Sequence, residues 1–266
     1  MKTRIISGII MGAIVAAVLS VGFLVDDIII TIAIGALVAV AIYELLHNAA
    51  GIKDKLTVYG AGLFSFLLIM TSQFGKYAFG SLLLACVLYS IFAVAMILRN
   101  HGDFDLSKIA VTYGFPIMFS AAFFCLNGII ISGKGIYYLL LLLNFSSVCD
   151  MGAYFVGVTC GKHKLCPKIS PKKTVEGAIG GIVSSIVFSV IISLCFDKFS
   201  VELLLMTVPF CILGMIGDLF ASAIKRSVDL KDYGTLIPGH GGIMDRLDSI
   251  IMIAPLMFLS IGLGVI

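Results

Sequence analysis

Long apolar runs separated by short polar segments occupy most of the chain. Charged residues bound the runs, and each run is about as long as a helix that crosses a lipid bilayer. Because a hydrocarbon core about 30 Å thick requires roughly 20 apolar residues per helix, the pattern predicts about nine transmembrane helices. They are expected at residues 5–25, 28–46, 57–73, 77–98, 109–131, 136–160, 174–196, 199–224 and 246–266.

Composition strengthens this interpretation. Hydrophobic residues make up 60% of the 266 positions and charged residues 12%, whereas about 25% of the residues in a soluble domain are charged. The sequence therefore predicts an all-α integral membrane protein with a single polytopic domain. The first apolar run is longer than the core of a signal peptide and another run follows it at once, so we expect it to be a retained helix.

Basic residues predict how the chain is oriented. If the N-terminus is cytoplasmic, all but three of the 18 lysines and arginines fall in inside segments or at their edges. The positive-inside rule therefore predicts a cytoplasmic N-terminus and an outside C-terminus. Two inside loops stand out, residues 161–173 and 225–245, which together combine lysines with acids, glycines and prolines. Topology signals or lipid anchors explain the lysines, but not the other residues.

Three carboxylates fall within predicted helices: Glu44, Asp150 and Asp218. An ionisable group inside a membrane costs at least a few kcal/mol, so such a residue indicates function. Glu44 lies near the end of its helix and is expected to reach the interface.

Asp218 has polar companions on its own helix. Asp218, Ser222 and Lys225 are spaced at i, i+4 and i+7 and share one helix face, with Arg226 at its edge. These groups either neutralise one another inside the membrane or form part of a binding site.

The loop before the last predicted helix is rich in glycine and charge. Asp245 and Asp248 open that helix, where acids also favour the helix dipole. Gly239, Gly241 and Gly242 allow a tight turn and a close approach of backbone amides to an anion. His240 is interpreted as either a phosphate donor or a turn residue. Cations near this turn are Lys225, Arg226, Lys231 and Arg246.

The other polar loop offers a second half of a site. Asp150, Tyr154 and Gly157 are spaced at i, i+4 and i+7, and residues 170–174 present two lysines and two hydroxyls at the start of a helix. Helix starts favour anions. The alternative is a capped helix start with solvated lysines.

Carboxylates, cations and a glycine turn suit the binding of metal-bound phosphates, because Mg²⁺ prefers oxygen ligands and retains water and phosphate oxygens. Neither a GxxxxGK[ST] nor a GxGxxG sequence is present, so a P-loop or Rossmann site is not supported. The seven cysteines lie mostly in apolar runs without paired spacing and are interpreted as buried hydrophobes.

These residues resemble the signature of the phosphatidate cytidylyltransferase, or CDP-diacylglycerol synthase, family. The resemblance covers residues 222–226, 231–232 and 238–248, and upstream Asp150, Tyr154, Gly157, residues 161–162, 170–174 and 176–177. Residues 1–140 match only in being apolar helices. They are interpreted as a scaffold, and residues 141–266 as the catalytic helices and loops.

The resemblance implies that CTP and phosphatidate react to give CDP-diacylglycerol and pyrophosphate, with Mg²⁺ in a one-metal or two-metal site. It places metal on Asp218 and Asp245, with Asp248 and Asp150 as further candidates. The other expected catalytic groups are Lys225 and Arg226. The expected substrate-binding residues are Asp150, Tyr154, Ser170, Lys172, Lys173, Thr174, Ser222, Lys231, His240, Gly241, Gly242 and Arg246.

The site is expected at the cytoplasmic rim, because one substrate is water-soluble and the other is anchored in the bilayer. The similarity is compatible with a homodimer, and no nucleic-acid partner is expected.

Two other functions remain open at this point. A CTP-dependent lipid kinase would add one phosphate to its lipid instead of cytidine. An ion-coupled transporter would use Asp150 and Asp218 as relay residues, although the sequence contains no symmetry-related repeat. A CDP-alcohol phosphatidyltransferase would require a DG…AR…G…D…D pattern, which the sequence lacks.

Overall fold

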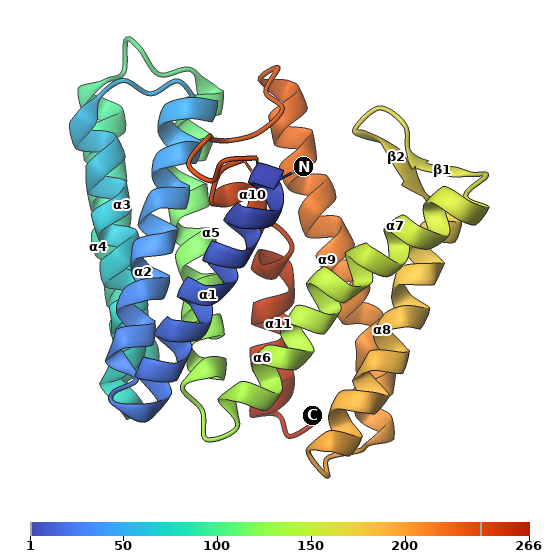
Figure 1. Ribbon diagram of the computed structural model, residues 1–266. Coiled ribbons are helices and arrows are strands. Elements are labelled where there is room, and N and C mark those ends of the chain that lie inside the picture. Colours follow the sequence, from blue (N-terminus) through green and yellow to red (C-terminus); the bar gives the residue numbers. More distant parts are fainter. Residues whose placement is uncertain (1, 240) are drawn as a thin grey trace. The chain divides into compact units, whose positions relative to one another are not determined.

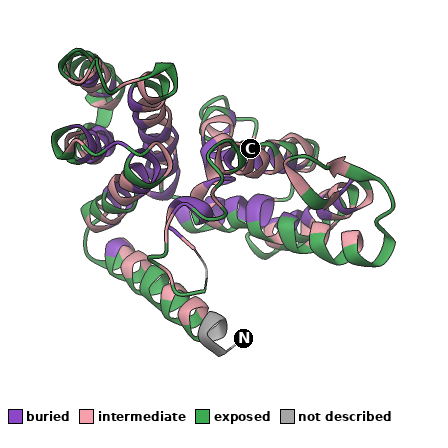
Figure 2. Cartoon of the chain, turned by 90° about the horizontal axis from the view of Figure 1, so that it is seen from above, coloured by how far each residue is buried: buried purple, intermediate pink, exposed green. Residues whose placement is uncertain are grey.

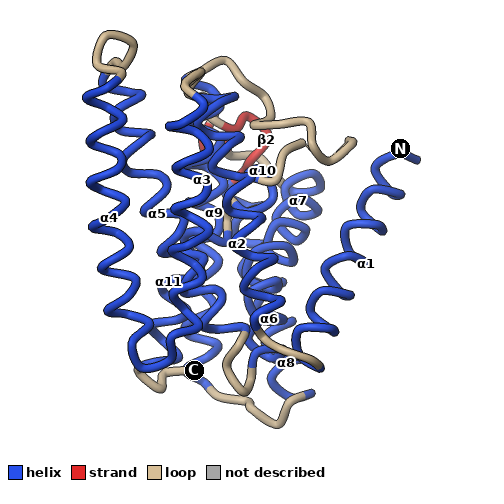
Figure 3. Tube along the Cα trace, turned by 90° about the vertical axis from the view of Figure 1, so that its left-hand side faces the viewer, coloured by secondary structure: helices blue, strands red, loops and turns tan. Residues whose placement is uncertain are grey.

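A computed structural model describes residues 2–239 and 241–266, excluding the side chains of residues 2–5. Helices dominate the described chain, and its strands form one short hairpin (Figure 3). The prediction of an all-α membrane protein is confirmed. His240 lies outside the described residues, so its role stays a prediction.

Seven helices in the described residues are long and apolar enough to span a membrane. One of them, Lys55–Arg99, has 45 residues, which at ~1.5 Å per residue is about twice the length that a bilayer core requires. It contains a non-helical break, where Gly75 has φ 54° and ψ −121°, and its two halves pack against each other as an antiparallel pair (Figure 1). The count of nine helices stays a prediction. The seven spans are Ile6–Leu24, Ile28–Ala49, Lys55–Arg99, Leu106–Ile130, Gly135–Cys160, Val175–Cys195 and Val201–Ser227.

The chain divides into two compact units, Met1–Ile131 with Val228–Leu247, and Ser132–Ser227 with Asp248–Ile266. In the first unit, α2 packs against α3 and α5, and its Val38, Ala41 and Ile42 are fully buried. Helix α1 is mostly exposed (Figure 2). The elements of this unit are α1 (Lys2–Leu24), α2 (Ile28–Tyr43), the π-helical turn η1 (Glu44–Ala49), α3 (Lys55–Met70), the 3-10 segment η2 (Thr71–Tyr77), α4 (Ala78–Arg99), α5 (Leu106–Ile130) and α10 (Met244–Leu247).

A buried amide joins three helical segments of the first unit. Asn127 of α5 donates from Nδ2 to Thr31 Oγ1 of α2 at 2.8 Å and to Ser72 Oγ of η2 at 2.7 Å. Because a buried polar group requires a hydrogen-bond partner, these bonds fix the turn between α3 and α4 against α2 and α5.

The second unit contains an almost continuous apolar helix followed by a hairpin and three further helices. Strands β1 (Lys164–Cys166) and β2 (Ser170–Thr174) are antiparallel, with Lys164 opposite Thr174 and Cys166 opposite Ser170. The sequence pattern did not predict this hairpin, since three residues carry too little alternation to identify a strand. The helices are α6 (Gly135–Leu143), the π-helical turn η3 (Asn144–Val148), α7 (Cys149–Cys160), α8 (Val175–Cys195), α9 (Val201–Ser227) and α11 (Ile250–Gly262).

Helices α7 and α8 lie side by side because glycine removes the side chains at their contact. A Cβ added at Gly177 would lie 2.6 Å from the carbonyl oxygen of Ala153, and one at Gly181 would lie 2.6 Å from that of Cys149. Small residues that let helix backbones approach closely are typical of membrane helix pairs. The β1–β2 hairpin connects these two helices and is therefore carried on a closely packed base.

Replacing Gly181 with alanine is expected to destabilise this helix pair by roughly 1–3 kcal/mol, the usual cost of overpacking. The measurement is the thermal unfolding temperature in detergent, which should fall by several degrees. Gly80→Ala in α4 is the matched control, since no atom lies within 4 Å of its added Cβ. Equal unfolding temperatures for the two variants would show that the contact at Gly181 does not determine stability.

The prediction of one continuous helix over residues 246–266 is wrong. The structure has a short helix α10 and a separate α11, with Asp248 and Ser249 between them. Asp248 Oδ1 accepts a hydrogen bond from the Ser249 backbone N–H at 2.8 Å, and such side-chain bonds compete with helix formation. Asp245 therefore lies in α10, whereas Asp248 lies at the break and not on the helix itself.

Candidate active site

The second unit brings together the polar hairpin region and the polar face of α9, which the sequence identified separately. Lys173 of β2 forms an ion pair with Asp218 of α9, and their side chains are 24% and 25% exposed. The hairpin after α7 positions the lysine, and one face of α9 positions the acid. Lys173 is therefore not a solvated lysine at a helix start.

Three carboxylates of this unit influence one another. Asp150 of α7 interacts electrostatically with Lys173 and with Asp218. Asp248 interacts with Asp218, Lys225 and Asp150. Burial is the largest cause that raises the pKa of the Asp248 carboxyl, to about 7, and the neighbouring Asp218 carboxylate contributes to the same shift. Acids from three separate segments therefore share a region with two lysines.

The remaining predicted residues of the second unit differ in exposure. Ser222 and Lys225 are partly buried on α9, whereas Arg226 is exposed near its end. Lys172 and Tyr154 are exposed, and Ser170 is partly buried. Exposed cations at these positions are accessible to a charged ligand.

Thr174 has a structural task. Its Oγ1 accepts a hydrogen bond from the Gly177 backbone N–H at 3.1 Å and caps α8, a geometry typical of helix starts. The alternative of a capped helix start is confirmed for this residue, and its contact with substrate stays a prediction.

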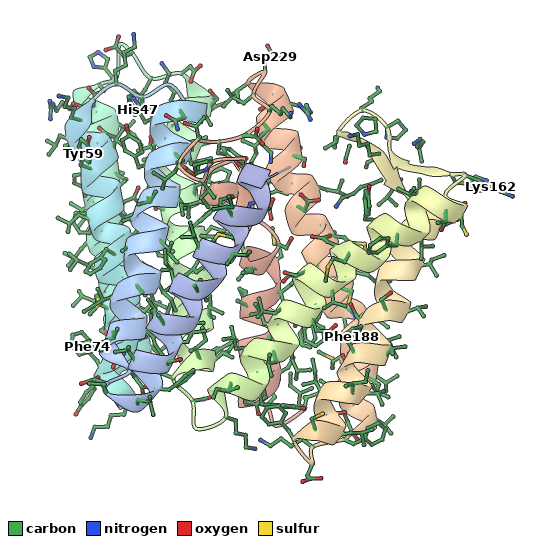
Figure 4. The ribbon with its side chains drawn as sticks, viewed as in Figure 1. His47, Tyr59, Phe74, Lys162, Phe188 and Asp229 are labelled. Atoms are coloured by element: carbon green, nitrogen blue, oxygen red, sulfur yellow. The ribbon has the colours of Figure 1, made fainter. Side chains whose placement is uncertain are left out.

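Glu176 holds the beginning of the hairpin against α8. Its carboxylate accepts hydrogen bonds from the backbone N–H of Lys162 at 3.0 Å and of His163 at 3.1 Å. His163 Nδ1 also lies 2.6 Å from Glu176 Oε1. Lys162 marks this end of α7 in Figure 4. The sequence identified Glu176 only as part of a motif, because its partners are backbone groups that a sequence does not display.

Asp245 organises the glycine-rich loop of the first unit. The side chain is buried, and its Oδ2 accepts hydrogen bonds from the backbone N–H of Tyr233 at 2.9 Å and of Gly242 at 3.0 Å. Gly241 has φ +88°, a conformation that glycine adopts without strain, and its carbonyl accepts from the Ile237 N–H at 2.9 Å. The predicted glycine turn is therefore present. Lys231 and Arg246 are exposed beside it in the chain.

The expectation that Glu44 reaches the interface is wrong. Its side chain is buried at 3% exposure, and Oε2 accepts a hydrogen bond from the Met244 backbone N–H at 3.0 Å. The two residues are 200 positions apart, so no local pattern around Glu44 indicated this contact. Glu44 therefore contacts the glycine-rich loop region, a contact that the sequence did not predict.

The acids of the second unit are compatible with a cation, although they do not form a complete cage. In residues 2–239 and 241–266, no group of three or more His, Cys, Asp and Glu side chains is arranged to hold a metal ion. Mg²⁺ in nucleotide enzymes uses one or two carboxylates and fills its other positions with water and substrate phosphates. The crowding of Asp150, Asp218 and Asp248 fits that smaller requirement. Metal binding by Asp218 and Asp245 stays a prediction.

The fold and the site define an integral membrane protein whose polar groups suit phosphate chemistry. A family model described as the cytidylyltransferase family matches residues 2–263, and the chain belongs to this family. The phosphatidate cytidylyltransferase of Bacillus subtilis is 34% identical over 99% of this chain and 98% of its own length. The phosphatidate cytidylyltransferase of Staphylococcus saprophyticus is 33% identical over 64% of this chain and 67% of its own length.

Proposed function

We propose that this protein transfers the cytidylyl group of CTP to phosphatidate, forming CDP-diacylglycerol and pyrophosphate. The observation that carries this proposal is the match to the cytidylyltransferase family over nearly the whole chain, together with similarity to named phosphatidate cytidylyltransferases. The contact of Lys173 with Asp218 supports it, since both belong to the polar set suited to phosphates.

In this reaction an oxygen of the phosphatidate phosphate attacks the α-phosphorus of CTP. A new P–O bond forms, the bond between the α-phosphorus and the bridging oxygen breaks, and pyrophosphate leaves with that oxygen. The attacking phosphate is already anionic, so no general base is required. Catalysis then consists of alignment and charge neutralisation.

The basic residues of the site have the matching task. Lys173 lies beside Asp218 and Asp150, where its ammonium group can reduce the repulsion between these acids and an approaching phosphate. Lys172, Arg226 and Arg246 are exposed and can contact the triphosphate or the lipid phosphate.

Asp218 and Asp245 are the proposed ligands of Mg²⁺, with Asp248 and Asp150 as additional candidates for a second ion. A magnesium ion would supply positive charge to the α-phosphate and to the departing pyrophosphate. The carboxylates would hold and orient that charge, and in the second unit Lys173 and Lys225 offset the negative charge of Asp150, Asp218 and Asp248.

The site is proposed to face the cytoplasm, where the positive-inside rule places the basic loops. A water-soluble nucleotide reaches that face, and the lipid phosphate lies at the same depth in the membrane. A homodimer is also proposed, from the similarity to the family. The mass of the purified protein in detergent is the measurement that tests it.

The test uses the purified protein in detergent with phosphatidate, Mg²⁺ and CTP labelled at the α-phosphate. Label in the lipid together with released pyrophosphate is the expected result. If phosphatidate takes no label, a second assay replaces it with diacylglycerol. An unlabelled phosphate gained by that lipid, with the label left in soluble CDP, would show a lipid kinase. Turnover with neither lipid would contradict both activities and favour transport.

A further inference from the structure

Two side chains of one helical turn hold the loop that carries Asp245. In the π-helical turn η1 (Glu44–Ala49), Glu44 Oε2 accepts the Met244 N–H at 3.0 Å. Four residues later, Asn48 Nδ2 donates to the carbonyl oxygen of Tyr233 at 2.8 Å. Figure 4 labels His47 of the same turn, which marks the end of α2 that meets this loop.

The loop is shaped around the Glu44 carboxylate. A Cβ added at Gly234 would lie 2.2 Å from Glu44 Oε1, and one added at Gly242 would lie 2.3 Å from Oε2. Any larger residue at either position would therefore displace the carboxylate. Two glycines that belong to separate parts of the loop are adapted to one buried side chain.

The loop positions that η1 holds are those that orient Asp245. The Tyr233 carbonyl oxygen accepts a hydrogen bond from Asn48, and the Tyr233 N–H donates to Asp245 Oδ2. Gly242 packs on Glu44 and donates its own N–H to the same Asp245 oxygen. Met244, which donates to Glu44, directly precedes Asp245. Three loop residues thus connect η1 to one carboxylate.

We propose that Glu44 and Asn48 are positioning residues that fix the Asp245 carboxylate for catalysis, an inference that rests on the proposed function. A buried carboxylate in a membrane helix is costly, and backbone hydrogen bonds offset part of that cost. Glu44 in turn stabilises the loop, because removing Glu44 would leave the buried Met244 N–H without its acceptor. Neither residue belongs to the loop signature itself.

The experiment combines hydrogen–deuterium exchange of a peptide covering residues 232–247 with steady-state kinetics. In Glu44→Ala, exchange of this segment is expected to rise about tenfold or more, and kcat to fall by a similar factor, as for one unsatisfied buried amide. KM values for both substrates should change less than kcat. Asn48→Ala should act in the same direction with a smaller effect.

Glu44→Gln is the conservative variant, because its amide oxygen can still accept the Met244 N–H. It should restore both exchange protection and kcat to within about threefold of the wild type. Glu202→Ala is the matched control, since this exposed glutamate lies in the first turn of α9. Its exchange at residues 232–247 and its kcat should equal those of the wild type.

Gly234→Ala tests the same contact from the loop side. It replaces Glu44→Ala as the test variant if Glu44→Ala does not fold. The added methyl group should displace Glu44 and increase exchange of the loop. Combined with Glu44→Ala, it should add little, because the atom it strikes is gone. Additive effects, or unchanged exchange in both single variants, would overturn the proposal.

The proposed function and the positioning role of Glu44 and Asn48 can be rejected independently. Label transfer by the wild-type protein decides the proposed function, and exchange of residues 232–247 reports loop order without any turnover. Loosened exchange with kcat unchanged would show that Glu44 and Asn48 hold the loop without positioning Asp245 for catalysis, and would overturn the inference alone.

Discussion

Replacing Asp218 with asparagine is expected to lower kcat/KM by about 10³-fold, at the upper end of the effect of removing one electrostatic contact from a transition state. The change keeps the size of the side chain and removes its charge. Lys173 then loses its ion-pair partner, and the region that holds Asp150 and Asp248 loses one of its three acids. Label transfer from α-labelled CTP to phosphatidate is the measurement.

Magnesium titration separates a ligand role from a general electrostatic role. If Asp218 binds the metal, residual activity of Asp218→Asn should require a higher Mg²⁺ concentration than the wild type requires. Asp245→Asn should show the same pattern. Asp229→Asn is the control, because Asp229 is exposed in the turn after α9 and its φ of 54° suits asparagine equally well. An unchanged kcat/KM in folded Asp218→Asn would reject its assignment.

Replacing Lys173 with methionine is expected to lower kcat/KM by about 10²-fold, in line with the loss of one charged contact to a transferring phosphate. Lys173 is partly buried beside Asp218 and Asp150, so its charge acts where water screens it weakly. Methionine keeps most of the length of the chain and removes the ammonium group. The measurement is the same label transfer, with KM determined for each substrate.

Lys168→Met is the matched control for this change, since Lys168 is exposed in the turn between β1 and β2. Its effect should stay within about threefold, as for a solvated charge. The double variant Lys173→Met with Asp218→Asn should lose less than the product of the two single losses, because the residues form one ion pair. Independent, multiplicative losses would show that Lys173 acts apart from Asp218.

Patterns that repeat within one element were predictable from the sequence. Apolar runs identified the helices because lipid requires about 20 residues per crossing. The polar face of α9 followed from helical spacing at Asp218, Ser222 and Lys225, and the glycine turn followed from the need for positive φ. Both depend on neighbours a few residues away, which a sequence displays directly.

Contacts between distant elements were not predictable in the same way. The pairing of Lys173 with Asp218 depends on the hairpin, whose strands are too short to show alternation. Glu44 was misplaced because its partner is a backbone amide of Met244, and a backbone amide has no residue type by which to recognise it. The break at Asp248 likewise depends on a local side-chain bond that competes with a helix which the apolar pattern favours.

The bond between Glu44 and Met244 also sets an order of events during synthesis. At the usual rate of ~5–20 residues per second, the 200 residues that separate the two take about 10–40 s to add. Until then the Glu44 carboxylate of η1 lacks the backbone donor that the loop later provides. The N-terminal helices are therefore expected to complete their packing only near the end of translation. Chains that terminate early are expected to expose the unpartnered Glu44 carboxylate to membrane quality control.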